Sequence, residues 1–85
     1  MYVNHIYITL CYIFYMNTAK KIGNNLKEAR KFKGLTQKEV AAELRMTQQQ
    51  YSRFENGVFE LNYEQVLFLC DLYEITPNEL FNIKD

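Results

Sequence analysis

The side chains best suited to chemistry in this sequence form a polar stripe between residues 48 and 56. Four hydrogen-bonding residues, none of them acidic, recur at the i, i+3, i+4 and i+7 positions of one helix face: Gln49, Ser52, Arg53 and Asn56. A glutamine amide offers a donor and an acceptor that match adenine N6 and N7, and an arginine fork fits guanine or a phosphate. Gln48 lies in the first turn, where a recognition helix meets base edges. The stripe predicts contact with double-stranded nucleic acid; the alternative is a solvated polar face.

Two short helices are expected to position this stripe. Thr36 and Thr47 each begin a capping-box motif, in which a hydroxyl residue is followed three positions later by Glu or Gln. The motifs predict two helices, over 36–44 and 47–56. The caps lie eleven residues apart, which is the spacing of a helix-turn-helix whose second helix enters the DNA major groove. Gln50 is expected to cap its helix rather than to contact a base.

The rest of the chain predicts three more helices, over 20–33, 62–74 and 77–82. Asn62 is a favourable N-cap residue. Thr76 begins another capping-box motif, and Pro77 suits the first helical turn. Gly34 and Gly57 lie where the preceding helices should end. The expected fold is therefore all-α with five helices.

Apolar residues at helical spacing predict the core of this fold. They are Ile22, Leu26, Ala29, Val40, Ala41, Leu44, Tyr51, Phe54, Tyr63, Val66, Leu67, Cys70, Tyr73, Ile75, Leu80 and Phe81. Three residues of the fourth helix, Phe68, Leu69 and Leu72, lie beyond its core stripe. A helix that is apolar nearly all round is usually covered on both sides, so a second surface is expected over these residues.

Composition and charge limit the classes of function that this chain can have. The 85 residues are 48% apolar with no net charge, which excludes disorder and most enzyme architectures. Residues 20–53 carry nine basic and three acidic residues, whereas residues 54–85 carry one basic and seven acidic. A basic half favours a polyanionic partner. Because no nucleophile–base pair, paired acids or phosphate loop stands out, we expect neither an enzyme nor a cofactor.

The cysteines and the histidine bear on disulfides, metal binding and the redox environment of the protein. Cys11 and Cys70 are far apart, and His5 is the single histidine. This set predicts no disulfide framework and no metal site, and it favours a reduced, cytoplasmic setting.

Residues 1–16 form an apolar N-terminal extension ahead of the domain expected over 17–85. They contain no charged residue and are rich in aromatic and β-branched types, which favours a strand-like or irregular segment. They are too short for a transmembrane helix. The segment could cover the fourth helix of its own or a partner subunit, or associate with a membrane surface. The preferred interpretation is that Met16 is the natural start.

Residues 22–81 resemble the Cro/phage-repressor (XRE-like) helix-turn-helix family. The specific motifs are LTQKEVA at residues 35–41 and SRFENG at residues 52–57, followed by ITPNELF at residues 75–81. The resemblance implies a lambda-repressor-like domain of five helices that binds operator DNA, commonly as a homodimer. It also implies that Arg30 and Glu55 form a structural ion pair.

Nine residues are expected at the DNA: Gln37, Lys38, Arg45, Thr47, Gln48, Gln49, Ser52, Arg53 and Asn56. By the resemblance, Gln37 meets the DNA backbone, Gln48 and Gln49 read bases, and Asn56 contacts a phosphate. Lysines and arginines of residues 20–53 would add the salt-dependent contacts.

Two departures from the family pattern affect these expectations. Arg45 replaces a frequent glycine, so the turn is expected to be strained or altered. The loop at residues 58–61 (VFEL) lacks the usual basic residues. The leading hypothesis is a sequence-specific transcriptional regulator, most simply a repressor. The alternative is an interaction module of the same fold, which would bind a protein through an apolar surface: Phe59, Phe68 and Leu72.

Overall fold

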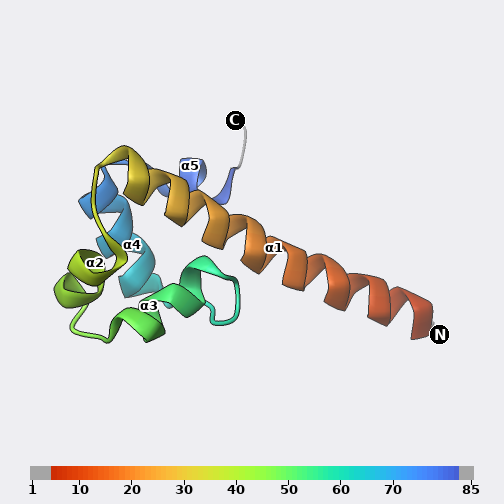
Figure 1. The fold of residues 1–85 in the computed structure, drawn as a ribbon. Helices are drawn as coiled ribbons and strands as arrows, with labels where there is room; N and C mark the ends of the chain where they lie inside the picture. The colour runs from red at the N-terminus through yellow and green to blue at the C-terminus, as the bar shows by residue number, and fades with distance from the viewer. Residues whose placement is uncertain (1–4, 83–85) are drawn as a thin grey trace.

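A computed structural model describes the backbone of residues 5–82 and the side chains of residues 18–82. It contains five helices in this part of the chain: α1 (His5–Phe32), α2 (Gln37–Glu43), α3 (Gln48–Glu55), α4 (Tyr63–Tyr73) and α5 (Pro77–Phe81) (Figure 1). The all-α, five-helix fold predicted from the sequence is confirmed.

Four of the helices begin where the capping motifs predict. Thr36, Thr47, Asn62 and Thr76 each accept a hydrogen bond from the backbone N–H three residues later. The side chain at that third position accepts a hydrogen bond from the backbone N–H of the cap residue, as in the 2.9 Å contact from the Thr47 N–H to the Gln50 amide oxygen. These reciprocal bonds satisfy N–H groups that a helix start leaves unpaired. The capping role of Gln50 is confirmed.

The N-terminal extension is helical, and its strand-like interpretation is wrong. α1 begins at His5 and runs without a break to Phe32. No glycine or proline precedes Gly23, and adding turns to an existing helix is favourable once it is nucleated. In Figure 1 the N-terminal part of α1 runs away from α4, so residues 5–16 do not cover α4 of their own chain. No helix in the described part is long and apolar enough to cross a membrane.

All five helices contribute side chains to one core. The fully buried large side chains are Tyr51, Tyr73, Leu26, Leu69, Leu80 and Val40. The phase predicted for α4 is partly wrong: Leu69 is buried, whereas Tyr63 and Leu67 are 90% and 62% exposed. Phe81, also expected in the core, is exposed as well. A helix that is apolar nearly all round does not encode in its sequence which face turns inward.

α1 approaches α3 at Gly23. A Cβ atom at this position would lie 2.4 Å from the Glu55 carbonyl oxygen and 2.6 Å from that of Phe54. Both are backbone atoms at the end of α3, so only a residue without a side chain allows this crossing. Gly23 therefore sets the distance between the long helix and the helix that carries the polar stripe.

Candidate nucleic-acid interface

In the turn between α2 and α3, an arginine adopts the left-handed backbone conformation that favours glycine. Arg45 has φ of 56°, and its N–H donates to the Ala42 carbonyl at 3.1 Å. The next N–H, of Met46, reaches the Ala41 carbonyl at 3.0 Å. The strain expected at this position is present, because left-handed backbone is costly for a residue with a Cβ. The Arg45 side chain is exposed.

The turn brings α2 and α3 together around a surface depression that we call the α2–α3 hollow. Five side chains line it: Gln37, Gln48, Gln49, Ser52 and Arg53. Gln48, Gln49 and Arg53 are exposed, while Gln37 and Ser52 are half-buried. The hollow therefore gathers amides, a hydroxyl and a guanidinium, all of which can hydrogen-bond to base edges or phosphates.

The other four residues expected at the DNA lie outside the lining of this hollow. Lys38 and Arg45 are exposed. The Thr47 hydroxyl accepts the Gln50 N–H at 3.1 Å, so it is used as a cap. The Asn56 side-chain N–H donates to the Ser52 Oγ at 3.3 Å. Thr47 and Asn56 thus have local partners in addition to any role at DNA.

Beneath the hollow lies the ion pair that the resemblance implies. Arg30 Nε donates to Glu55 Oε2 at 2.7 Å, and Nη2 donates to Oε1 at 3.2 Å. Arg30 Nη1 also donates to the Leu35 carbonyl at 2.9 Å. The Arg30 and Glu55 residues are 9% and 5% exposed. Arg30 therefore links α1 to α3 through Glu55 and to the loop before α2 through Leu35.

Gln37 connects this buried pair to the surface. Its Nε2 donates to Glu55 Oε1 at 3.0 Å, while the residue also lines the α2–α3 hollow. The family resemblance implies that Gln37 meets the DNA backbone. The sequence gives no sign of its contact with Glu55, because the two residues are far apart in the chain. The amide keeps its oxygen and a second N–H for another partner.

The charge state of Glu55 follows from its partners. Burial alone would raise its pKa, but hydrogen bonds from Arg30, Gln37 and Tyr51 outweigh burial and hold the pKa below the ordinary value. Tyr51 and Tyr73 share a buried hydroxyl contact of 2.5 Å, and burial raises the pKa of Tyr73 to about 12. At neutral pH this cluster therefore contains one carboxylate, one guanidinium and two neutral phenols.

We expect the protein to lose stability as the pH falls through the lowered pKa of Glu55. The unfolded chain binds the proton more tightly than the folded one, so the contribution of Glu55 is present above its ordinary pKa and disappears below the folded value. Thermal unfolding between pH 7 and pH 3 measures this loss. Glu39→Gln is the control, because glutamine also completes the capping box. A flat profile, or one that Glu39→Gln abolishes, would contradict the assignment to Glu55.

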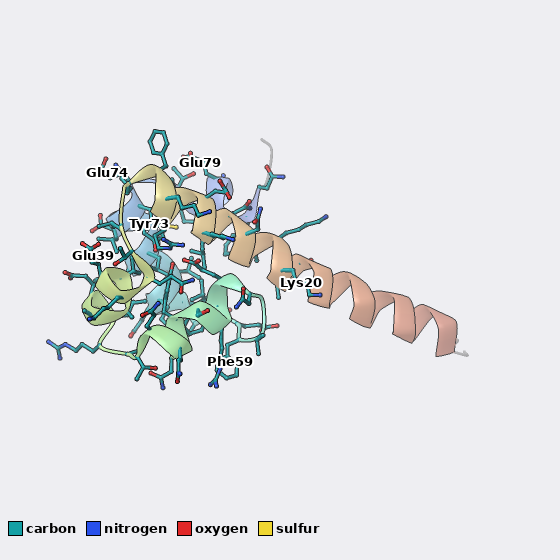
Figure 2. All side chains as sticks on the ribbon, in the orientation of Figure 1. Lys20, Glu39, Phe59, Tyr73, Glu74 and Glu79 are labelled. Carbon is teal, nitrogen blue, oxygen red and sulfur yellow. The ribbon has the colours of Figure 1, made fainter. Side chains whose placement is uncertain are left out.

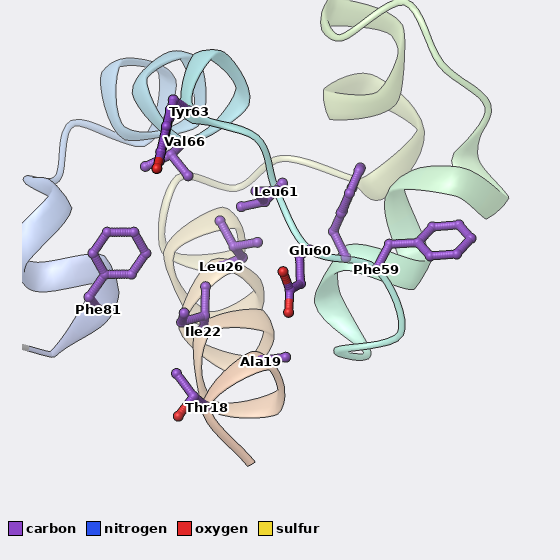
Figure 3. A pocket seen from close by; sticks show the side chains of 11 residues that line it. Thr18, Ala19, Ile22, Leu26, Phe59, Glu60, Leu61, Tyr63, Val66 and Phe81 are labelled. Atoms are coloured by element: carbon purple, nitrogen blue, oxygen red, sulfur yellow. The ribbon is translucent and has the colours of Figure 1, made fainter. Parts of the chain in front are cut away.

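The three residues of the alternative interface lie on two different elements. Phe59 belongs to the α3–α4 loop, where it is 46% exposed. Phe68 on α4 is 41% exposed, while Leu72 is half-buried against the core. Phe59 lines an apolar hollow of about 180 Å³ between α1, this loop, α4 and α5, together with Ile22 and Phe81 (Figure 3). Phe68 and Leu72 do not line that hollow.

The described residues show no group that would bind a metal, since no three His, Cys, Asp or Glu side chains cluster there. Cys70 is a free, buried thiol. Cys11 and His5 lie outside the residues whose side chains are described.

A family model for a helix-turn-helix domain, of the XRE/Cro-repressor type, matches residues 23–85. This range contains all of α2 to α5, the C-terminal part of α1 and the whole α2–α3 hollow. The comparisons with curated proteins and with solved structures gave no match.

Proposed function

Because this chain belongs to the helix-turn-helix domain family of the XRE/Cro-repressor type, we propose that it is a DNA-binding regulator that recognises a specific operator and represses transcription. The observation that carries the proposal is the α2–α3 hollow, whose lining combines three glutamines with an arginine. These side chains match the donors and acceptors of the major groove. No acidic residue lines the hollow, so its surface favours a polyanion.

Selection of duplexes from a random library, followed by fluorescence anisotropy in a salt series, tests this proposal. A specific regulator enriches one sequence and binds it more tightly than a scrambled duplex. The logarithm of its affinity falls linearly with the logarithm of salt concentration, and the slope counts the phosphates contacted. Absence of enrichment together with absence of binding at low salt would refute DNA recognition.

We expect Gln49→Ala to relax base preference at one position of the selected duplex. The loss of a two-point contact to adenine costs about 1–3 kcal/mol in discrimination against the wrong base. Gln50→Ala is the matched control, because Gln50 has the same side chain but caps α3. Equal losses on the selected and the scrambled duplex would contradict direct readout by Gln49.

The proposed assembly is a homodimer on a two-fold symmetric site. Two copies of α3 would then occupy successive major grooves about 34 Å apart. Sedimentation of the protein alone and with the selected duplex measures the number of chains per duplex. A palindromic selected sequence bound by two chains is the expected result, and one chain on an asymmetric site would contradict it.

The second candidate function is an interaction module that binds a protein partner. Exposed apolar side chains on α4 favour it, namely Tyr63, Leu67 and Phe68 at 90%, 62% and 41% exposure. Apolar surface of this kind commonly marks an interface. An interface of this kind would persist at high salt, where contacts to phosphates are lost. The two functions are compatible in one protein, since α4 lies outside the α2–α3 hollow.

A further inference from the structure

An aromatic residue of the α3–α4 loop lies against the arginine of the α2–α3 hollow. The Arg53 Cζ is 5.4 Å from the centroid of the Phe59 ring, which is within the range of a cation–π interaction. Arg53 lines the hollow with Gln48 and Gln49, whereas Phe59 does not. The ring therefore lies close to the arginine, and Figure 2 shows Phe59 beside α3.

Several contacts fix the position of this ring. The N–H groups of Val58 and Phe59 both donate to the Arg53 carbonyl, at 2.9 and 3.3 Å. The Phe59 ring also packs edge-to-face on Phe54, with centroids 6.4 Å apart and an interplanar angle of 65°. Phe54 is buried in the core, so the Phe59 ring packs against the core of the domain.

The start of the loop is fixed as well. Gly57 has φ of 73°, and a Cβ atom there would lie 2.8 Å from the Lys20 Cα. The loop thus turns sharply against α1 before it reaches Phe59. The loop backbone is therefore held against α1 on its way to Phe59.

We propose that Phe59 is a positioning residue, which orients the Arg53 guanidinium for contact with DNA. This inference rests on the proposed function. An arginine that stacks on an aromatic ring keeps its N–H donors available for a phosphate or a guanine. A side chain held in one orientation also loses less freedom when it binds. The loop that lacks basic residues thereby contributes to DNA binding through Arg53.

Binding to the duplex enriched by the unmodified protein tests this inference. Phe59→Leu should weaken specific binding about two- to five-fold, which is the range of an exposed cation–π contact. Phe59→Tyr keeps the ring and should bind within about two-fold of the unmodified protein. In a background of Arg53→Met, which removes the charge but keeps a long side chain, Phe59→Leu should have no additional effect on affinity.

A second measurement does not depend on DNA. In the free protein, ring-current shifts of the Arg53 Nε–Hε signal report the stacked guanidinium, and Phe59→Leu should abolish them while Phe59→Tyr keeps them. Val58→Ala is the control for the loop, because Val58 is 65% exposed.

The outcomes separate this inference from the proposed function. If the unmodified protein enriches no duplex, the proposed function fails. If it does enrich one, three results would overturn the role of Phe59: unchanged affinity in Phe59→Leu, equal weakening by Leu and Tyr, or equal weakening with and without Arg53. Phe59→Leu could also change the number of chains per duplex while leaving the ring-current shifts of Arg53 unchanged. That result would assign Phe59 to a protein interface and would overturn the proposal as well.

Discussion

Arg30→Met lowers the free energy of unfolding by about 3–5 kcal/mol, which is the cost of removing one member of a buried ion pair. Glu55 would lose both hydrogen bonds from the guanidinium and keep a carboxylate at 5% exposure. The Leu35 carbonyl would lose its contact with Arg30 as well. Small domains are stable by only about 5–15 kcal/mol, so we expect a large fall in the urea midpoint.

Two further measurements show whether the uncompensated charge is the cause. In Arg30→Met the pKa of Glu55 should rise, because burial is then opposed only by the hydrogen bonds from Gln37 and Tyr51. The variant should consequently lose less stability than the unmodified protein as the pH falls. The double variant Arg30→Met with Glu55→Leu should recover most of the loss, since apolar residues often replace a buried ion pair at little cost. A double variant as unstable as the single one would contradict this account.

Much of the fold follows from local sequence signals. Each helix start after α1 depends on a side chain within three residues of the backbone group that it pairs, so Thr36, Thr47, Asn62 and Thr76 predict those starts without knowledge of the tertiary structure. The polar stripe is similarly local, because helical spacing alone gathers Gln49, Ser52 and Arg53 on one face.

The remaining features depend on contacts between distant segments. The inward face of α4 is set by its neighbours, so periodicity assigned Leu67 to the core in place of Leu69. The hydrogen bond from Gln37 to Glu55 spans 18 positions, and no periodic pattern encodes it. In residues 5–16 the aromatic and β-branched composition predicts a strand, whereas this segment is helical and continuous with the rest of α1. Intrinsic β-propensity is strongly dependent on such context.

The interface and the core share residues, which connects recognition to stability. Glu55 ends α3, accepts the buried contact from Arg30 and holds Gln37 at the edge of the α2–α3 hollow. The carbonyl oxygens of Phe54 and Glu55 face Gly23 on α1. The C-terminal end of α3 is therefore held from two sides, and a change in either contact should move the stripe relative to α2.

Gly23→Val is the second change for which we expect a large effect. The first added carbon alone would lie within 3 Å of three backbone atoms of α3, and valine brings two more. Backbone atoms cannot relieve the clash by a change of rotamer, as a flexible side chain can. α1 and α3 must therefore move apart. We expect the free energy of unfolding to fall by about 3 kcal/mol or more, at or above the upper end of overpacking costs.

Thermal unfolding and duplex binding distinguish this mechanism from a change in helix propensity. Asn24→Val places the same side chain on an exposed neighbour in α1, where valine and asparagine have similar helix propensity; it should leave both measurements nearly unchanged. Gly23→Ala should be intermediate, because better helix propensity offsets part of its clash. Since the displaced atoms belong to α3, specific DNA binding should weaken even at temperatures where Gly23→Ala remains folded. If Gly23→Ala binds and unfolds like the unmodified protein, α1 does not set the position of α3.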